Sequence, residues 1–322
     1  MANDGRTILP FLLGAALALA GPAVQAGLSV SVTFNDPGDA HSAYHAVVRS
    51  AMASAADAWG TYVETAAGRT LAIEVNFTDE ATASAGSDKY VLDQAATAAS
   101  GVTTYMVGAV SKLAFGGGGG AEGAADAVFN IGEDWLTNVI WWNPSPTSTA
   151  APPPYKLDSQ YVFMHEIGHV LGFSSARDAS GAPPIFNGAP YQTTFDALIR
   201  REGDDLFFTG TAAAAAYGGQ PVPLTFANFS HVGNAAGSGR PGADLVDDVM
   251  NGVVSQYVHY ELSGVDVGVL ADLGYTLTAA GRALVYGAPP TTAPEPASIV
   301  ALALGVSGVA AHLVVFARRR AA

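Results

Sequence analysis

Two histidines and a glutamate within five residues carry the strongest chemical signal in this sequence. They stand in the run His165-Glu166-Ile167-Gly168-His169. If residues 159–171 are helical, His165 and His169 lie one turn apart on the same face, so both imidazoles can reach one metal ion at roughly 2.0–2.1 Å. Glu166 projects beside them, better placed to take a proton from a water held by the metal than to be a ligand. This spacing predicts the H-E-x-x-H site of a zinc peptidase.

The residues around this motif favour catalysis over a chance match on a solvated helix. Apolar side chains stand on both sides of the motif, at Tyr161, Val162, Phe163 and Met164 before it and at Val170 and Leu171 after it. A helix buried by such residues does not carry two histidines and a carboxylate without a partner for them. We therefore expect a metal between the histidines.

A catalytic zinc takes three protein ligands and leaves one position for water, so a third ligand is needed. The compact metzincin pattern H-E-x-x-H-x-x-G-x-x-H has its glycine here as Gly172, but Ser175 stands at the last position, and serine is a poor zinc ligand. The third ligand is expected farther along the chain. His231 is the first choice, and Asp178 and Glu202 are the alternatives.

The other histidines are expected to have no part in the site. His41 and His45 lie at the start of a predicted helix, away from its apolar stripe, and are interpreted as solvated surface. His259 is expected in the core, and His312 lies in an apolar C-terminal stretch.

The order of these residues resembles the leishmanolysin-type branch of the metzincins, in which a long insertion separates the third histidine from the helix. In this resemblance His165, His169 and His231 match the ligands and Glu166 the general base. The remaining matches are Gly172 for the helix exit, Met250 for the Met-turn and residues 262–275 for the C-terminal helix. It implies an α+β fold: a two-lobed zinc peptidase domain with a twisted mixed sheet and an active-site helix. Leishmanolysins are rich in disulfides and this chain has no cysteine, so only the catalytic core is expected to be shared.

Hydrophobic periodicity predicts the elements that position the motif. Residues 28–34 and 71–77 alternate as strands do, and residues 42–63 have helical spacing. Strand, helix and strand in this order predict a parallel pair with a crossover helix. Further strands are expected at 101–110 and 125–131, giving one twisted mixed sheet ahead of the active-site helix.

Both ends of the chain indicate export. Residues 1–26 have the apolar run and small cleavage-site residues of a secretory signal peptide, so the mature chain is expected to begin at Gly27. Residues 294–322 join Pro294-Glu295-Pro296 to an apolar stretch and three arginines. This arrangement resembles the PEP-CTERM sorting signal of Gram-negative bacteria, which implies a helix transiently in the membrane and processing by an exosortase. The peptidase domain is expected at 27–288, with a linker at 289–293.

The composition of the chain limits the classes of molecule that it is expected to bind. The formal net charge is −14, which disfavours nucleic acid or an anionic membrane as a partner and keeps an exported domain soluble. The absence of cysteine excludes disulfides and a latency thiol.

The predicted function is a secreted or surface zinc endopeptidase that acts on a protein or peptide. The alternatives are a non-catalytic extracellular surface or matrix protein that keeps the fold, and an enzyme acting on a non-peptide amide.

Overall fold

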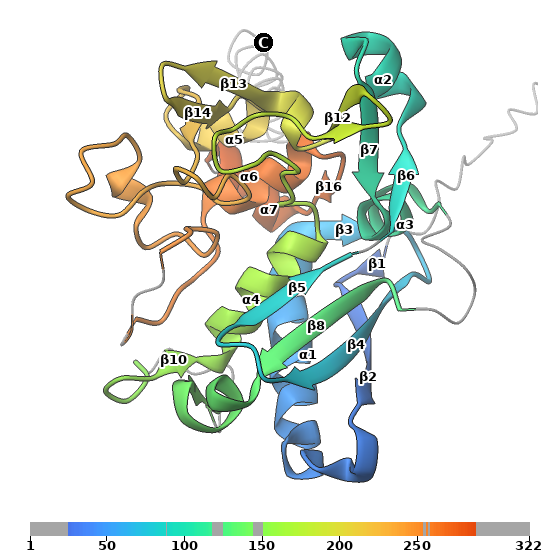
Figure 1. The fold of residues 1–322 in the computed structure, drawn as a ribbon, viewed down its shortest axis with the longest axis vertical. Helices are drawn as coiled ribbons and strands as arrows, with labels where there is room; N and C mark the ends of the chain where they lie inside the picture. The colour runs from blue at the N-terminus through green and yellow to red at the C-terminus, as the bar shows by residue number, and fades with distance from the viewer. Residues whose placement is uncertain are drawn as a thin grey trace, which may run out of the picture.

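The computed structural model describes residues 25–87, 89–117, 125–143, 151–253, 256 and 258–287. Within these residues helices and several small sheets form an α+β fold (Figure 1). None of the described helices has the length and apolar character needed to span a membrane. Nearly all of the predicted signal peptide and the whole predicted C-terminal sorting signal lie outside the described residues.

The sheet nearest the motif has the strand order β2-β4-β8-β5. Its first three strands are parallel and β5 runs antiparallel at the edge, so the sheet is mixed. Helix α1 connects β2 to β4, which confirms the predicted parallel pair with a crossover helix. The bounds are β2 Ser29–Asn35, α1 His45–Tyr62, β4 Thr70–Thr78, β5 Ala83–Gly86 and β8 Ala127–Gly132.

Helix α1 packs its apolar stripe against helix α4 (Ser159–Val170), which carries the motif. Val48, Met52 and Trp59 have no exposed surface, and the Trp59 indole N–H donates to the Met164 carbonyl at 2.9 Å. Asp158 caps α4 by accepting from the Gln160 N–H at 2.9 Å. The helix therefore begins and ends within a residue of the prediction.

The expectation of a single sheet was wrong for residues 101–110. Strand β7 (Thr103–Val107) belongs to a second sheet, in the order β11-β12-β7-β6, and α3 (Gly108–Phe115) begins directly after it. Val107, Val110 and Leu113 are buried at helical spacing, which explains why the strand ends there. The other elements of this sheet are β6 Tyr90–Leu92, β11 Ile185–Phe186 and β12 Ala189–Thr193, with α2 Gln94–Ser100 beside them.

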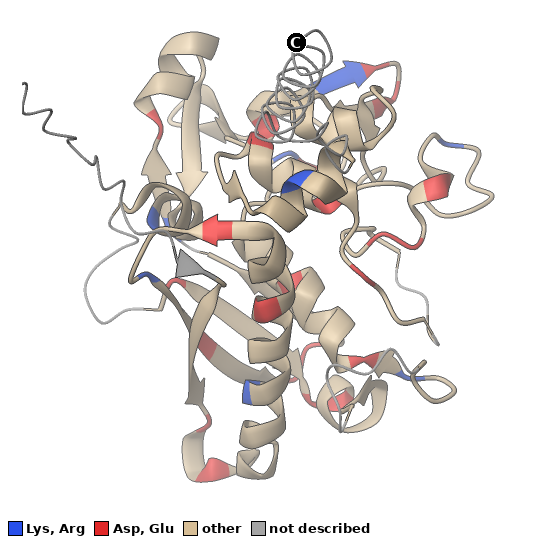
Figure 2. Ribbon diagram, turned by 180° about the vertical axis from the view of Figure 1, so that it is seen from behind, with Lys and Arg blue, Asp and Glu red and all other residues tan. Residues whose placement is uncertain are grey.

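The C-terminal half forms the opposite end of the molecule, and α4 lies between the two ends (Figure 1). Helices α5 (Thr211–Ala216), α6 (Gly264–Asp272) and α7 (Ala279–Tyr286) pack on one another there. A small sheet lies next to α5 and is made of β13 Ile199–Glu202, β14 Asp205–Phe208 and β15 Val222–Pro223. Short pairings complete the fold, involving β1 Gln25–Ala26, β3 Val63–Thr65, β9 Ile140–Trp141, β10 Leu157–Asp158 and β16 Thr276–Leu277. Acidic side chains outnumber basic ones across both ends (Figure 2).

Close backbone contact at Gly60 provides a test of the packing of α1. A Cβ at this position would lie 2.3 Å from the backbone nitrogen of Leu28. We expect Gly60→Ala to lower the free energy of unfolding by about 1–3 kcal/mol because the strand must move. Urea denaturation measures this loss. Gly86→Ala is the control, since its Cβ would meet nothing within 4 Å, and equal stability of the two variants would contradict the contact.

Candidate metal centre

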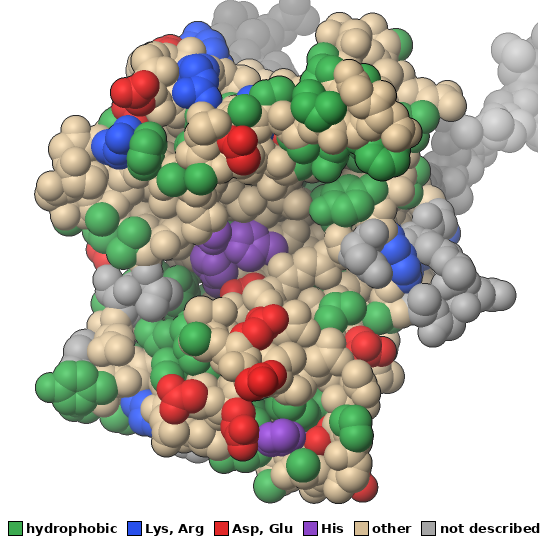
Figure 3. Space-filling view, in the orientation of Figure 1, with side chains coloured by type: hydrophobic (Ala, Val, Ile, Leu, Met, Phe, Trp, Pro, Cys, Tyr) green, Lys and Arg blue, Asp and Glu red, His purple; other side chains and the backbone are tan. Residues whose placement is uncertain are grey.

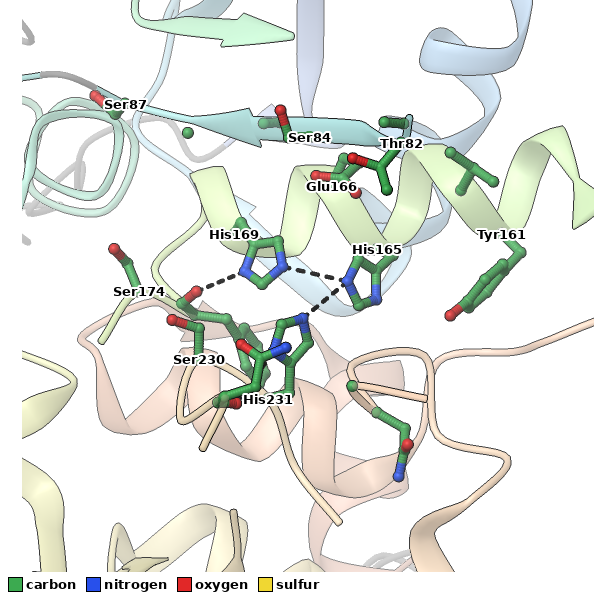
Figure 4. A pocket seen from close by; sticks show the side chains of 18 of the residues that line it. Thr82, Ser84, Ser87, Tyr161, His165, Glu166, His169, Ser174, Ser230 and His231 are labelled. Atoms are coloured by element: carbon green, nitrogen blue, oxygen red, sulfur yellow. Dashed lines mark hydrogen bonds between the residues drawn. The ribbon is translucent and has the colours of Figure 1, made fainter. Parts of the chain in front are cut away.

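Helix α4 presents two imidazoles from successive turns of one face. His165 and His169 are four residues apart, and their Nε2 atoms are 3.2 Å from each other (Figure 4). Both side chains are half-buried although most neighbouring positions of the helix are buried. The helix therefore supplies two nitrogen atoms that point at a common position.

A loop from the C-terminal half brings His231 to the same position. The His231 Nε2 lies 3.1 Å from the His165 Nε2, and the three ligand atoms all lie within 4.8 Å of one another. Val232, the next residue, donates its N–H to the Met250 carbonyl at 2.9 Å. The third histidine is thus fixed by the segment around Met250, and the three side chains form a buried histidine cluster.

Backbone carbonyls set the tautomer of all three imidazoles. The Nδ1–H groups donate to the carbonyls of Val249, Phe173 and Asn228, at 2.7 Å for His165, 2.7 Å for His169 and 3.2 Å for His231. A neutral imidazole with its proton on Nδ1 has only a lone pair on Nε2. Three lone pairs therefore face one another.

This donor set fits a metal ion. Three acceptors cannot hydrogen-bond one another, and a cation between them can satisfy all three lone pairs at once. Nitrogen ligands at roughly 2.0–2.1 Å around a tetrahedral ion are about 3.3 Å apart, close to the 3.1 and 3.2 Å seen here. Carbonyls that accept from the second nitrogen of each ring are the usual support of histidine ligands. The cluster is a candidate metal centre.

Burial keeps these imidazoles neutral. It lowers the pKa of His165 to about 3 and that of His231 to about 2, and in both cases the neighbouring His169 adds to the effect. Burial also lowers the pKa of His169. Neutral imidazole is the form that binds metals, so the side chains have the required protonation state at neutral pH.

Glu166 lines the same cleft from the other side of α4. It points toward β5, where the Ala85 N–H donates to its carboxylate (Figure 4). Burial raises its pKa to about 8 despite this hydrogen bond. Among the described residues the group that could hold a metal ion consists of the three histidines and does not include Glu166.

Met250 packs beneath helix α4, which carries His165 and His169. It is fully buried, and a Cβ added to Gly168 would lie 2.3 Å from the Met250 sulfur. Gly168 stands between His165 and His169, so its missing side chain is what lets the methionine approach. At the end of the helix Gly172 has φ 126°, a conformation that favours glycine, and the chain turns away there.

The two ends of the insertion between helix α4 and His231 contact each other. The Ser175 N–H donates to the Ser230 hydroxyl at 2.9 Å, and the Ser175 hydroxyl donates to Asp196 at 2.6 Å. Ser175 thus binds the neighbour of His231 and stays out of the cluster. The alternative ligands lie elsewhere, since Asp178 accepts hydrogen bonds within its own turn and Glu202 pairs with Arg200.

Three other histidines contact carboxylates in place of the expected environments. His41 and His45, expected on the solvated surface, are half-buried and both contact the Asp36 carboxylate. His45 also stacks on Phe34 with ring centroids 4.0 Å apart. The Asp36 carboxylate and the aromatic ring faces therefore explain why these histidines are not fully solvated. His259 is half-buried and lies 2.8 Å from the Asp158 carboxylate.

The cluster opens into a cleft of about 510 Å³. The histidines lie in a hollow between the two ends of the molecule (Figure 3). One wall is residues 82–87, which include the edge strand β5, and the other includes Ser174, Ser230 and Gly252. An extended chain can therefore lie between β5 and the histidines.

Sequence reasoning missed this wall and the residues that orient the ligands. Residues 83–86 are Ala-Ser-Ala-Gly, whose small side chains give no strand periodicity, and the carbonyls of Phe173, Asn228 and Val249 leave no mark in a sequence. Gly168 could have been noticed, because a glycine inside a helix often marks close packing.

Comparison with protein-family models, with curated proteins and with solved structures finds no match to this chain. What the site can do is therefore inferred from its own residues and their geometry.

Removal of His231 tests the metal centre. We expect His231→Ala to weaken metal binding more than roughly 100-fold. Loss of a residue that only supports a ligand costs up to about this factor, whereas this change removes a ligand and leaves two. Elemental analysis and a competition titration with a chelating dye measure this. His41→Ala, in the Asp36 pair, should bind like the parent protein. Equal metal content in both variants would place the ion elsewhere.

Gly168 and Met250 offer a second test. Gly168→Ala should lower the free energy of unfolding by about 1–3 kcal/mol, because the new methyl group displaces the methionine. In the background of Met250→Ala the same change should cost less, with a coupling of about 0.5–3 kcal/mol. Thermal and urea unfolding of the four proteins complete the cycle. A cost that is the same in both backgrounds would show that the contact is not responsible.

Proposed function

We propose that this protein is a zinc-dependent endopeptidase. The observation that supports this most directly is the convergence of three neutral imidazoles with a carboxylate, Glu166, in the same cleft and outside the ligand set. A structural metal site is closed by four protein ligands, whereas three ligands beside a cleft leave room for water and substrate. The sequence order His165, Glu166, His169 and distant His231, with Met250 beneath, also resembles a metzincin.

Each residue of the site has a separate role in the proposed hydrolysis of a peptide bond. Zinc, when bound, supplies a Lewis acid that acidifies water and polarises the scissile carbonyl. His165, His169 and His231 would hold it through Nε2. Glu166 takes the proton of the attacking water and passes it to the leaving amine. Burial raises its pKa to about 8, and a cation nearby would lower that pKa and leave the carboxylate ionised as a base at neutral pH.

Strand β5 gives the substrate its orientation. It is the edge of its sheet, and residues 82–87 line the cleft opposite the histidines. Apart from the Ala85 N–H, which donates to Glu166, the outer edge of β5 can offer backbone groups to an extended peptide, which pairs as an added strand. This supports a peptide as the substrate in preference to a compact amide.

We also propose export of the protein, processing by an exosortase and delivery to the cell surface or beyond it in a Gram-negative bacterium. This proposal rests on the sequence at residues 1–26 and 294–322, with its apolar stretches and terminal arginines.

Glu166→Gln separates an enzyme from a non-catalytic surface protein. The amide keeps the shape of the side chain but cannot accept a proton. We expect the variant to bind one zinc per chain and to lose at least 100-fold in turnover, since general base catalysis contributes typically 10²–10⁴-fold. Cleavage of a casein or fluorogenic peptide substrate measures turnover, and elemental analysis measures zinc. Retained turnover would exclude Glu166 as the base, and no turnover in the parent protein would favour the binding role.

A further inference from the structure

A second hollow lies beside the cleft, on one face of the sheet β11-β12-β7-β6. The register pairs Tyr90 with Val107, Tyr105 with Thr193, and Phe186 with Ala189. Because side chains alternate along a strand, one face of this sheet carries Tyr90, Tyr105, Phe186, Tyr191 and Thr193. Four aromatic side chains therefore gather on this face.

The hollow is small and apolar. Its volume is about 280 Å³, and its lining is Tyr90, Tyr105, Ala176, Phe186, Tyr191 and Thr193. A site for a drug-sized ligand is typically about 300–1,000 Å³, so this hollow has the size for one large side chain. None of the lining residues carries a charge, which disfavours a charged guest.

The aromatic rings are available to a guest. Tyr90 is 49 % exposed and Phe186 is 62 % exposed. Tyr105 and Tyr191 already meet edge to face, with centroids 5.9 Å apart and planes at 84°. A third aromatic ring can add to this pair with the same geometry. Exposed rings around a hollow are typical of a recognition site.

Tyr90 joins this hollow to the cleft, because it lines both. It follows β5 by a few residues, so the strand edge leads from the histidine cluster to the hollow. In Figure 3 hydrophobic side chains lie beside the histidines, over β6 and β7. One extended peptide could therefore contact both sites.

We propose that the hollow is a specificity subsite for a large apolar or aromatic side chain of the peptide substrate, N-terminal to the scissile bond. The inference rests on the proposed peptidase function. Antiparallel pairing is the more stable arrangement of strands. A peptide paired antiparallel to β5 has its N-terminal residues beside the end of β5 that leads to Tyr90. The occupied position is two to four residues before the bond that is cut.

Cleavage-site profiling of a peptide library by the full-length zinc protein tests this inference. The parent should show about tenfold enrichment of phenylalanine, tyrosine, tryptophan and leucine at one of these positions. Phe186→Ala should lose most of that enrichment. Ile185→Ala is the matched control, because Ile185 is 64 % exposed on the adjacent position and the opposite face of β11. No enrichment, enrichment C-terminal to the bond, or equal enrichment in Phe186→Ala would overturn the proposal.

A binding measurement separates the subsite from catalysis. Zinc-loaded Glu166→Gln is titrated with fluorescent heptapeptides of glycine, alanine and serine that carry one phenylalanine or none. We expect about tenfold tighter binding of the phenylalanine peptide, a ratio that falls toward one with Phe186→Ala and persists with Ile185→Ala. A ratio of one in a protein that cleaves peptides would overturn the subsite alone. A tenfold ratio without cleavage by the parent would overturn the peptidase function and leave the subsite as a peptide-binding site.

Discussion

The mutual repulsion of three imidazole lone pairs is the constraint on which the site depends. Each Nε2 is an acceptor without a proton, because each Nδ1–H is committed to a carbonyl. A buried polar group without a partner costs about 1–3 kcal/mol. The three carbonyls come from the helix exit, the loop before the third ligand and the segment before Met250. The arrangement therefore requires these distant segments to be in place, and a cation between the rings would relieve the repulsion.

Packing beneath the histidines connects this constraint to the core. Trp59 of α1 donates to the Met164 carbonyl of α4, and a Cβ at Gly168 would lie 3.2 Å from the Trp59 ring as well as against Met250. A single layer of contacts thus runs from α1 through the motif helix to the Met250 segment. Close-packed layers move little, so packing holds the three imidazoles near one another.

Local patterns predicted the elements that have strong periodicity. The motif helix, the crossover helix and the parallel pair agree with the structure because their apolar stripes are long. The second sheet and strand β5 could not be predicted in the same way. They are short, and β5 consists of small residues whose pairing with β8 depends on chain contacts over 40 residues away. The contact of His41 and His45 with Asp36 also depends on folding, since stacking on Phe34 and Phe77 brings the rings together.

Closure of the insertion at Ser175 and Ser230 has an evolutionary consequence. The cost of closing a flexible loop rises slowly with its length, by about 0.6 kcal/mol for each doubling. Since a hydrogen bond already joins the two ends of the insertion, an exposed turn within it can become longer or shorter without moving the imidazole of His231. The exposed turns of this segment are thus free to change in length while buried residues such as Phe195 and Phe208 keep its core in place, so the spacing of the histidines in a sequence is a poor guide to kinship for proteins built this way.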